Sequence, residues 1–399
     1  MTISLLFKKA FWPLAGAGAT YIGCLFLLIN PWLQRNAIYM NKLQLTWNYD
    51  LTKPEHFGFA KNQVTPFYIP TPDGEKLFAW HVLPLGLYAE QRDILLDHDS
   101  GLVEDITQNA AFQLLRNDPE ARLLIHFHGN AGTVGAGYRP IYTRSLSGAS
   151  PYKLHILTID YRGFGYSSGY PTEEGLITDG LSAVKWAIDV ARISPDRIAI
   201  MGQSLGTAVA FGVAEALINP PNAIEEDPSK GIELGAIISV AGFSHMKELL
   251  STYHIAGIIP VLAPLRPYPW AQAFFKKFVY ETWESSRKLA TLVKKSSWKL
   301  QLIILHAQND MQIPVEHSDF LFYAAANATI GEEEAFSMRD VREHKTTVEL
   351  GEEGYVNIWP VEKSGGKLIQ QWVVNWGEHN RVVTSSSVSL VVARALGLS

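Results

Sequence analysis

The sequence contains a single cysteine, Cys24, among its 399 residues, so no disulfide can form within the chain. This excludes a secreted scaffold that depends on internal disulfides for its stability. Positive charge is not in excess either, because 34 Lys and Arg stand against 39 Asp and Glu, giving a formal net charge of −5. Proteins that bind nucleic acid by charge carry a basic patch, so we expect no nucleic-acid partner.

Charged residues are also missing near the N-terminus, between Lys9 and Arg35. The apolar run 11–33 is long enough to cross a bilayer as a helix, at a rise of about 1.5 Å per residue. Trp12 and Trp32 lie near its two ends, and tryptophan favours the interface between membrane and water. The pattern predicts a single-pass membrane anchor.

We therefore assign residues 1–40 to the membrane anchor and residues 41–399 to the catalytic domain. A cleaved signal peptide is the alternative, but residues 30–35 lack the small-x-small pattern of a cleavage site. The basic residues that flank the run give a slight bias toward a cytosolic N-terminus and a lumenal catalytic domain. The glycosylation sequon 327–329 is compatible with a lumenal face.

The most informative motif is Gly-x-Ser-x-Gly at 202–206. It follows an apolar run, 198–201, that is typical of a buried strand, and small residues that favour a helix come after it. In this context the motif forms a nucleophile elbow, a tight turn in which glycines leave room for neighbouring backbone. We predict that Ser204 is a nucleophile and that the backbone N–H of Leu205 stabilises an oxyanion.

A serine hydroxyl needs a base, and proteins with such an elbow carry Ser, then Asp or Glu, then His along the chain. The apolar run 300–306 is followed by Asp310, at a strand end where open α/β sheets place their chemistry. A further strand-like run, 369–374, is followed by His379. We predict that His379 takes the proton of Ser204 and that Asp310 holds its imidazole tautomer.

A second oxyanion donor is expected after another strand. The apolar run 123–127 leads into His-Gly-Asn-Ala-Gly at 128–132, which matches the His-Gly type of oxyanion loop. The backbone N–H of Asn130 is the candidate partner for that of Leu205. Each such donor contributes on the order of 3 kcal/mol at the transition state.

Four other histidines allow alternative interpretations. His317 and His344 are rivals for the base, but His317 lies at an apparent helix start and His344 lies in a charged insert. His126 and His128 are two residues apart on a strand and share one face, so zinc is conceivable, but no third ligand is in view. We therefore predict no metal site and no cofactor.

Strands alternate with helices along most of the chain, beginning with a hairpin over residues 66–82. This alternation predicts an α/β fold with a mostly parallel sheet that helices cover on both faces. Polar or irregular segments interrupt the pattern and are expected to be inserts, at 86–120, 219–233 and 330–368.

The segment 243–299 is predicted to form a lid, because it contains an uncharged stretch, 255–265, followed by prolines and aromatic residues. We expect this lid to line an acyl pocket and to approach the membrane, although ordinary packing onto the core is an alternative. The candidate pocket residues are His128, Phe164, Phe243, Ile258 and Leu262.

Together these motifs resemble the membrane-anchored branch of the α/β-hydrolase-domain serine hydrolases. That branch includes the monoacylglycerol and lysophosphatidylserine lipases of the endoplasmic reticulum and their fungal bud-emergence-like relatives. The resemblance covers most of residues 60–395, including Asp-Tyr-Arg-Gly-Phe-Gly at 160–165. It implies the triad Ser204, Asp310 and His379, a long-chain acyl ester as substrate, and the endoplasmic reticulum membrane as the location.

The sequence therefore favours a membrane-bound lipid ester hydrolase that works through an acyl-enzyme on Ser204. An acyl-protein thioesterase or a peptidase on the same triad is an alternative within the enzymes. A catalytically silent scaffold is the alternative from another class, although such proteins usually lose the serine or the histidine. The acyl length, the headgroup and the oligomeric state are left open by the sequence.

Overall fold

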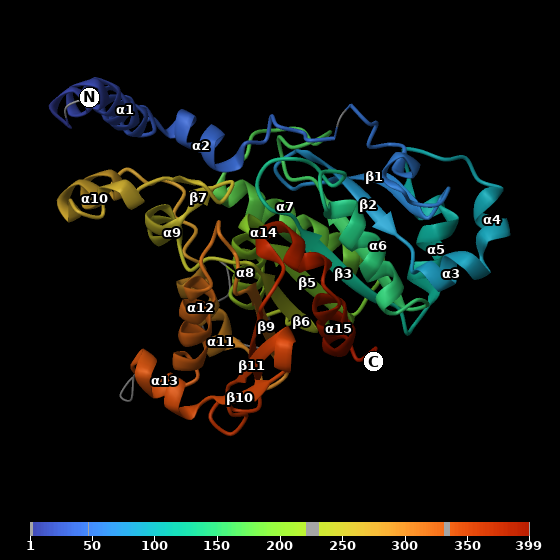
Figure 1. The fold of residues 1–399 in the computed structure, drawn as a ribbon. Helices are drawn as coiled ribbons and strands as arrows, with labels where there is room; N and C mark the ends of the chain where they lie inside the picture. Colours follow the sequence, from blue (N-terminus) through green and yellow to red (C-terminus); the bar gives the residue numbers. More distant parts are fainter. Residues whose placement is uncertain (1–2, 47, 221–230, 331–335, 399) are drawn as a thin grey trace.

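The computed structural model describes residues 3–46, 48–220, 231–330 and 336–398, and a ten-stranded sheet crosses the centre of this part (Figure 1). The strand order is β1-β2-β4-β3-β5-β6-β9-β12-β11-β10. The six central strands, from β4 to β12, run parallel, while the strands at both edges are antiparallel. The strands are β1 (Val64–Pro70), β2 (Lys76–Val82), β3 (Arg122–Phe127), β4 (Leu154–Ile159), β5 (Ile198–Gln203), β6 (Ala236–Val240), β9 (Gln301–Ala307), β10 (Thr346–Glu349), β11 (Gly354–Ile358) and β12 (Leu368–Val374).

Two hydrophobic cores lie on the two faces of this sheet. In β3, Leu123 and Ile125 belong to one core and Leu124 belongs to the other, as the alternation of side chains along a strand requires. The first core packs under α7 (Glu173–Lys185), α8 (Leu205–Ile218), α11 (Ser285–Lys295) and α12 (Glu316–Asn327), and the second packs under α6 (Arg139–Ala149) and α15 (Ser386–Ala395). The predicted α/β architecture is confirmed, and the parallel strand ends meet at one edge.

The predicted inserts contain more regular structure than the sequence indicated. Segment 86–120 includes α4 (Arg92–Leu96) and α5 (Ala110–Asn117), adjoining α3 (Leu85–Glu90), and Phe112 of α5 reaches the first core. Segment 330–368 includes α13 (Met338–His344), and its strands β10 and β11 extend the sheet beside β12. Within the predicted insert 219–233, residues 221–230 lie outside the described residues.

We limit the name lid to the first part of the segment 243–299, whose role as a lid stays a prediction. It follows β6 and contains α9 (Met246–Thr252), the hairpin of β7 (His254–Ile255) and β8 (Ile259–Pro260), and α10 (Pro269–Lys276). The helix α11, which we had expected within the lid, instead covers the sheet, because its buried Leu289, Leu292 and Val293 belong to the first core. Lid residues therefore end before α11.

The N-terminal apolar run does not form one continuous helix. Helix α1 (Ile3–Leu27) ends before Asn30, whose side chain accepts hydrogen bonds from the N–H groups of Trp32 and Leu33 and starts α2 (Pro31–Tyr39). In the described part of the chain no single helix is long and apolar enough to cross a membrane. By length and composition the segments Phe11–Leu27 and Pro31–Tyr39 meet that requirement as a pair bent by 104°.

Both N-terminal helices lie against the lid (Figure 1). The ring of Phe26 in α1 lies 5.4 Å from the ring of Phe275 in α10, and Leu25 shares a buried cluster with Leu262 and Leu265. The Tyr21 hydroxyl donates to the carbonyl of Val261 at 2.7 Å. The segment that we assigned to the anchor is thus packed on the domain that follows it.

Candidate active site

The turn between β5 and α8 has the geometry of a nucleophile elbow. Ser204 adopts φ 54° and ψ −120°, a conformation that is rare for a residue with a side chain. A Cβ atom on Gly202 would lie 2.1 Å from the carbonyl oxygen of Gly206, and one on Gly206 would lie 2.0 Å from that of Phe127. Both glycines are therefore required for the close approach of the backbone, as predicted.

The structure brings together the three side chains predicted as a triad. Ser204 Oγ lies 2.9 Å from His379 Nε2, and His379 Nδ1 lies 2.8 Å from Asp310 Oδ2. Asp310 follows β9, and His379 belongs to α14 (Glu378–Arg381), which follows β12. All three side chains are largely buried. In this arrangement the imidazole is able to accept the serine proton while the carboxylate holds the opposite ring nitrogen.

Asp310 is surrounded by donors. Its Oδ1 accepts from the N–H groups of Gln312 at 2.8 Å and Ile313 at 2.9 Å, while Oδ2 lies 3.3 Å from His306 Nε2. Burial alone raises the pKa of Asp310, but the hydrogen bonds from His306 and His379 outweigh it and hold the pKa below its usual range. Asp310 therefore stays ionised. Sequence reasoning missed His306. Its position on β9, four residues before Asp310, could have indicated that the two side chains lie close together.

The predicted oxyanion loop follows β3 and is held by a partly buried arginine, Arg139, that sequence reasoning also missed. Its guanidinium donates to four backbone carbonyls, those of Gly129 (3.0 Å), Asn130 (3.2 Å), Ala131 (2.8 Å) and Thr133 (2.7 Å). The C=O of Gly129 and the N–H of Asn130 belong to one trans peptide and point in opposite directions. By binding the carbonyl, Arg139 fixes the direction of the candidate oxyanion donor.

His128 and Asp160 form a buried pair behind this loop. His128 Nδ1 lies 2.7 Å from the carbonyl of Gly129, and its Nε2 lies 3.3 Å from Asp160 Oδ1, which also accepts from the N–H of Val134. Burial raises the pKa of Asp160 to about 7 and lowers the pKa of His128 well below its usual value. Burial therefore favours the neutral form of both side chains.

Comparison with known proteins agrees with this fold. A family model described as the alpha/beta hydrolase fold matches residues 122–224. Lysophosphatidylserine lipase ABHD12 of Danio rerio is 25% identical over 298 residues, which cover 75% of this chain and 68% of that protein. Protein ABHD12B of Homo sapiens is 29% identical over 301 residues, which cover 73% of this chain and 69% of that protein.

The chain is a serine hydrolase with the α/β-hydrolase fold and is similar to proteins named as lipases. A solved structure of an esterase from Pyrococcus furiosus also aligns with this hydrolase, at a TM-score of 0.49 and 15% identity, covering 89% of this chain and 97% of that chain.

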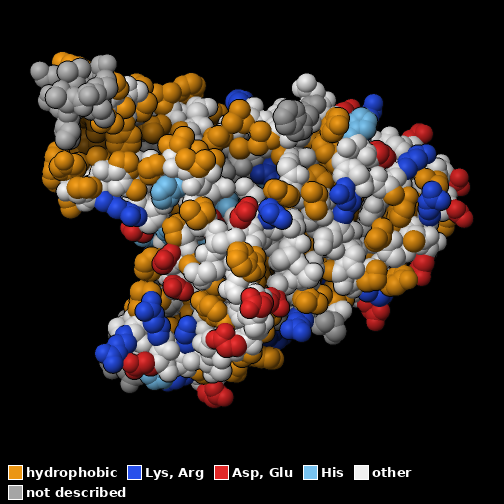
Figure 2. All heavy atoms as spheres, in the orientation of Figure 1, with side chains coloured by type: hydrophobic (Ala, Val, Ile, Leu, Met, Phe, Trp, Pro, Cys, Tyr) orange, Lys and Arg blue, Asp and Glu red, His pale blue; other side chains and the backbone are white. Residues whose placement is uncertain are grey.

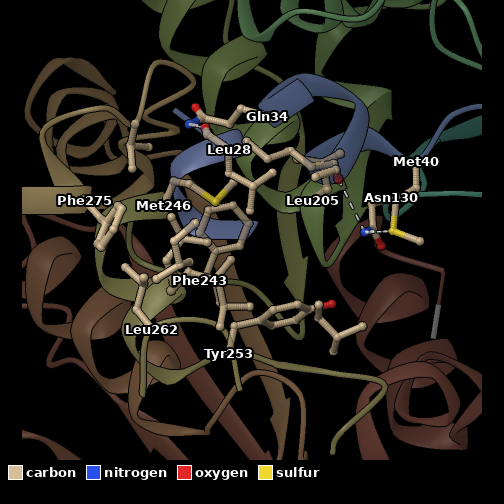
Figure 3. Close-up of a pocket in the computed structure, with 18 of the residues that line it drawn as sticks. Leu28, Gln34, Met40, Asn130, Leu205, Phe243, Met246, Tyr253, Leu262 and Phe275 are labelled. Atoms are coloured by element: carbon tan, nitrogen blue, oxygen red, sulfur yellow. Dashed lines mark hydrogen bonds between the residues drawn. The ribbon is translucent and has the colours of Figure 1, made fainter. Parts of the chain in front are cut away.

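A largely apolar pocket opens beside Ser204 in this hydrolase (Figure 3). It encloses about 1130 Å³ of empty space, part of it open to solvent. Asn130 and Leu205, the two candidate oxyanion residues, line it next to Ser204, and the predicted Phe243 and Leu262 line it from the lid side. An apolar cavity that meets a nucleophile and two candidate donors is suited to the acyl part of an ester.

Three of the predicted pocket residues lie elsewhere. His128 and Phe164 are fully buried behind the oxyanion loop, where their rings pack against each other with centroids 5.4 Å apart. Ile258 is 78% exposed, because the β7–β8 hairpin carries it away from the cavity. The prediction failed at these positions because pocket lining depends on how distant segments pack.

The rival histidines have other contacts. His317 lies 3.1 Å from Ser244 Oγ and 2.8 Å from Thr252 Oγ1, and burial lowers its pKa to about 4. His344 is exposed on α13, with Nδ1 2.8 Å from the carbonyl of Asp340. Neither arrangement places a ring against Ser204, so the geometry favours His379 as the base.

The two strand histidines face different surroundings. His126 lies between Thr158 Oγ1 at 3.4 Å and the Tyr142 hydroxyl at 3.2 Å, whereas His128 pairs with Asp160. Throughout the described residues, no group of three or more His, Cys, Asp or Glu side chains is arranged to hold a metal ion.

The raised pKa of Asp160 predicts a pH-dependent stability. Because burial raises the folded pKa from 3.8 to about 7, the stability from this carboxyl is fully present below about pH 4 and is lost as the pH rises through 7. Asp160→Asn removes this titration while keeping an acceptor for the Val134 N–H. The difference in Tm between wild type and variant should therefore shrink or reverse between pH 4 and pH 8.

Thermal unfolding followed at several pH values measures this difference. Asp93→Asn, at an exposed position, is the control and should leave the pH profile unchanged. A constant Tm difference across the range for Asp160→Asn would show that Asp160 does not hold its proton in the folded protein.

Proposed function

We propose that this hydrolase cleaves the carboxylic ester of a long-chain acyl lipid, a lysophospholipid or a monoacylglycerol, through an acyl-enzyme on Ser204. The observation that carries the proposal is the largely apolar cavity that Ser204 lines together with Phe243 and Leu262, the last two labelled in Figure 3. The apolar lining is suited to a single acyl chain. The polar headgroup, on the other side of the ester bond, would then lie outside this lining.

The proposed reaction has two steps. Ser204 Oγ attacks the ester carbonyl while His379 takes its proton, and the N–H groups of Asn130 and Leu205 stabilise the oxyanion. The ester C–O bond breaks, and His379 gives the proton to the leaving alcohol. Water then attacks the acyl-enzyme with His379 as base, releasing the fatty acid and restoring Ser204. Ionised Asp310 stabilises the imidazolium in both steps.

The lining supports a hydrocarbon ligand rather than a polar one. Gln34 of α2 lines the pocket with an amide side chain, and both polar atoms of that amide already have hydrogen-bond partners. Its Nε2 donates to the carbonyls of Leu28 at 3.0 Å and Phe278 at 2.8 Å, and its Oε1 accepts from the N–H of Tyr280 at 2.9 Å. The similarity to lysophosphatidylserine lipases places lysophospholipids first among the candidate substrates.

We propose further that the enzyme is membrane-bound through α1 and α2 and that the lid contributes to the contact. Figure 2 shows hydrophobic side chains gathered over the projecting lobe that carries α1 and α10. Trp12 in α1 is 76% exposed, Trp270 in α10 is 75% exposed, and Ile258 lies between the two lid strands. Tryptophan and isoleucine at such positions favour a lipid interface. The flanking charges give a slight bias toward a lumenal catalytic domain, and the resemblance to the membrane-anchored hydrolases supports the endoplasmic reticulum as the location.

The first test is glycerol release from a long-chain monoacylglycerol, and fatty acid release from a lysophospholipid, by membranes that carry the protein. Ser204→Ala should lower kcat by about 10³-fold or more while the protein still folds, because the nucleophile is lost. Retained activity in Ser204→Ala would overturn the assignment of the nucleophile. Wild type that reacts with a fluorophosphonate at Ser204 but releases no fatty acid would point to thioesters instead.

The base is tested by comparing His379→Ala with His344→Ala. His379→Ala should lower kcat by at least about 10³-fold, because it removes the acceptor of the serine proton. His344→Ala should stay near wild type, because its exposed ring contacts a helix carbonyl. Activity lost in His344→Ala but kept in His379→Ala would move the base to the other histidine.

The lid contact predicts a dependence on the form of the substrate. Trp270→Glu combined with Ile258→Glu should slow hydrolysis of a lipid embedded in vesicles several-fold, because carboxylates are excluded from the apolar interface. Hydrolysis of a soluble short-chain ester should be unchanged. Trp298→Glu, at a site 65% exposed outside the lid, is the matched control. An equal loss with both substrates would argue against a lid contact with the membrane.

A further inference from the structure

The N-terminal segment forms one side of the cavity that meets Ser204. Leu28 and Ile29 follow α1, and Ile38 and Met40 come from the end of α2 and the residue after it; all four line the cavity. In Figure 3 Leu28 and Met40 lie on the side opposite the lid residues Leu262 and Tyr253. The hydrocarbon lining is thus shared between two segments that are more than 200 residues apart in the sequence.

A buried carboxylate joins this segment to the end of the lid. Glu281 Oε1 lies 2.5 Å from Arg35 Nε, and its Oε2 accepts from the Tyr39 hydroxyl at 2.9 Å and from the N–H of Glu173 at 2.6 Å. Glu281 is only 3% exposed. A buried carboxylate with one cation and two further donors is a strong attachment, because breaking it leaves the charge unpaired.

The same segment is bonded to the oxyanion loop. The N–H of Ala131 donates to the carbonyl of Tyr39 at 2.9 Å, and the N–H of Gly132 donates to that of Leu43 at 2.6 Å. Ala131 has φ 53°, a left-handed conformation that a residue with a side chain rarely adopts without support from its neighbours. The position of residues 25–43 is therefore fixed relative to Ser204 as well as to the lid.

We propose that residues 25–43 are a substrate-binding wall, against which the acyl chain lies during the reaction, in addition to any role in membrane attachment. The proposal rests on the proposed function, because it assumes an acyl ligand in this cavity. It follows that the length and bulk of the accepted chain depend on side chains of the N-terminal segment. Leu28 is the best probe, since the neighbouring Leu27 is 61% exposed and does not line the cavity.

The test uses the full-length protein in membranes and two alkyl fluorophosphonates, one with a short chain and one with a chain of about sixteen carbons. Leu28→Trp should slow labelling of Ser204 by the long-chain probe at least tenfold, because one or two methylene groups in an apolar pocket already change binding by about 10–200-fold. Labelling by the short-chain probe should stay within twofold of wild type. Leu27→Trp is the matched control and should leave both rates within twofold.

Leu28→Ala keeps the proposal testable where the tryptophan variant fails to fold. It enlarges the cavity, so the ratio of long-chain or branched-chain labelling to short-chain labelling should rise. The proposal would be overturned if Leu28→Ala left the labelling ratio unchanged. It would also be overturned if Leu27→Trp and Leu28→Trp slowed labelling by the long-chain probe equally. These rates do not depend on the natural substrate. Normal probe selectivity without ester hydrolysis would therefore contradict the proposed function and leave the wall standing.

Discussion

The candidate site depends on one close backbone contact, between the start of α8 and the end of β3. A Cβ atom on Gly206 would lie 2.0 Å from the carbonyl oxygen of Phe127, so the two segments meet with no side chain between them. The contact sets Ser204, at the end of β5, beside the loop that begins at His128. Because β3 and β5 are neighbouring parallel strands, the loops that follow them lie at the same edge of the sheet. Gly206 lets these loops approach closely enough for both to contact the carbonyl group of one substrate.

Buried charge then holds the loops in place. Arg139 uses its guanidinium on four carbonyls of the oxyanion loop, and Asp310 receives two backbone N–H groups besides the two imidazoles. Asp310 is buried and Arg139 is partly buried, and unpaired polar atoms are destabilising away from water. The consequence for chemistry is pre-organisation: the donors and the ionised carboxylate are already oriented before a substrate arrives, so little reorganisation is needed in the transition state.

The parts of this site that depend on residues close together in the chain could be predicted from the sequence. The elbow requires particular residues at 202–206, and Asp310 and His379 follow apolar strands in a fixed order, so a short window of sequence contains each signal. Arg139 was missed because its partners are backbone carbonyls, and Glu281 because its partners are distant in sequence. His306 is four residues from its partner Asp310 and was within reach of sequence reasoning. The strands β10 and β11 were missed for a similar reason. Their place in the sheet depends on pairing with β12 rather than on a strong pattern of their own.

The N-terminal run is apolar, as its hydropathy indicates, but a membrane anchor alone does not account for all of its apolar residues. Trp12 and Leu14 are mostly exposed in the structure, and the proposed contact with lipid would account for their apolar character. Leu25 and Leu28 are apolar in the same run, yet they face the lid and the cavity. A hydropathy window sums both kinds of residue and cannot separate them.

The bend after Leu27 is the physical feature that separates the two roles. Asn30 caps the start of α2, and the segments Phe11–Leu27 and Pro31–Tyr39 meet at an angle of 104°. With α1 in lipid, as proposed, the residues beyond the bend, among them Ile38 and Met40, line the pocket together with Ser204. In that arrangement attachment to the membrane and selection of the acyl chain are two effects of one folded segment.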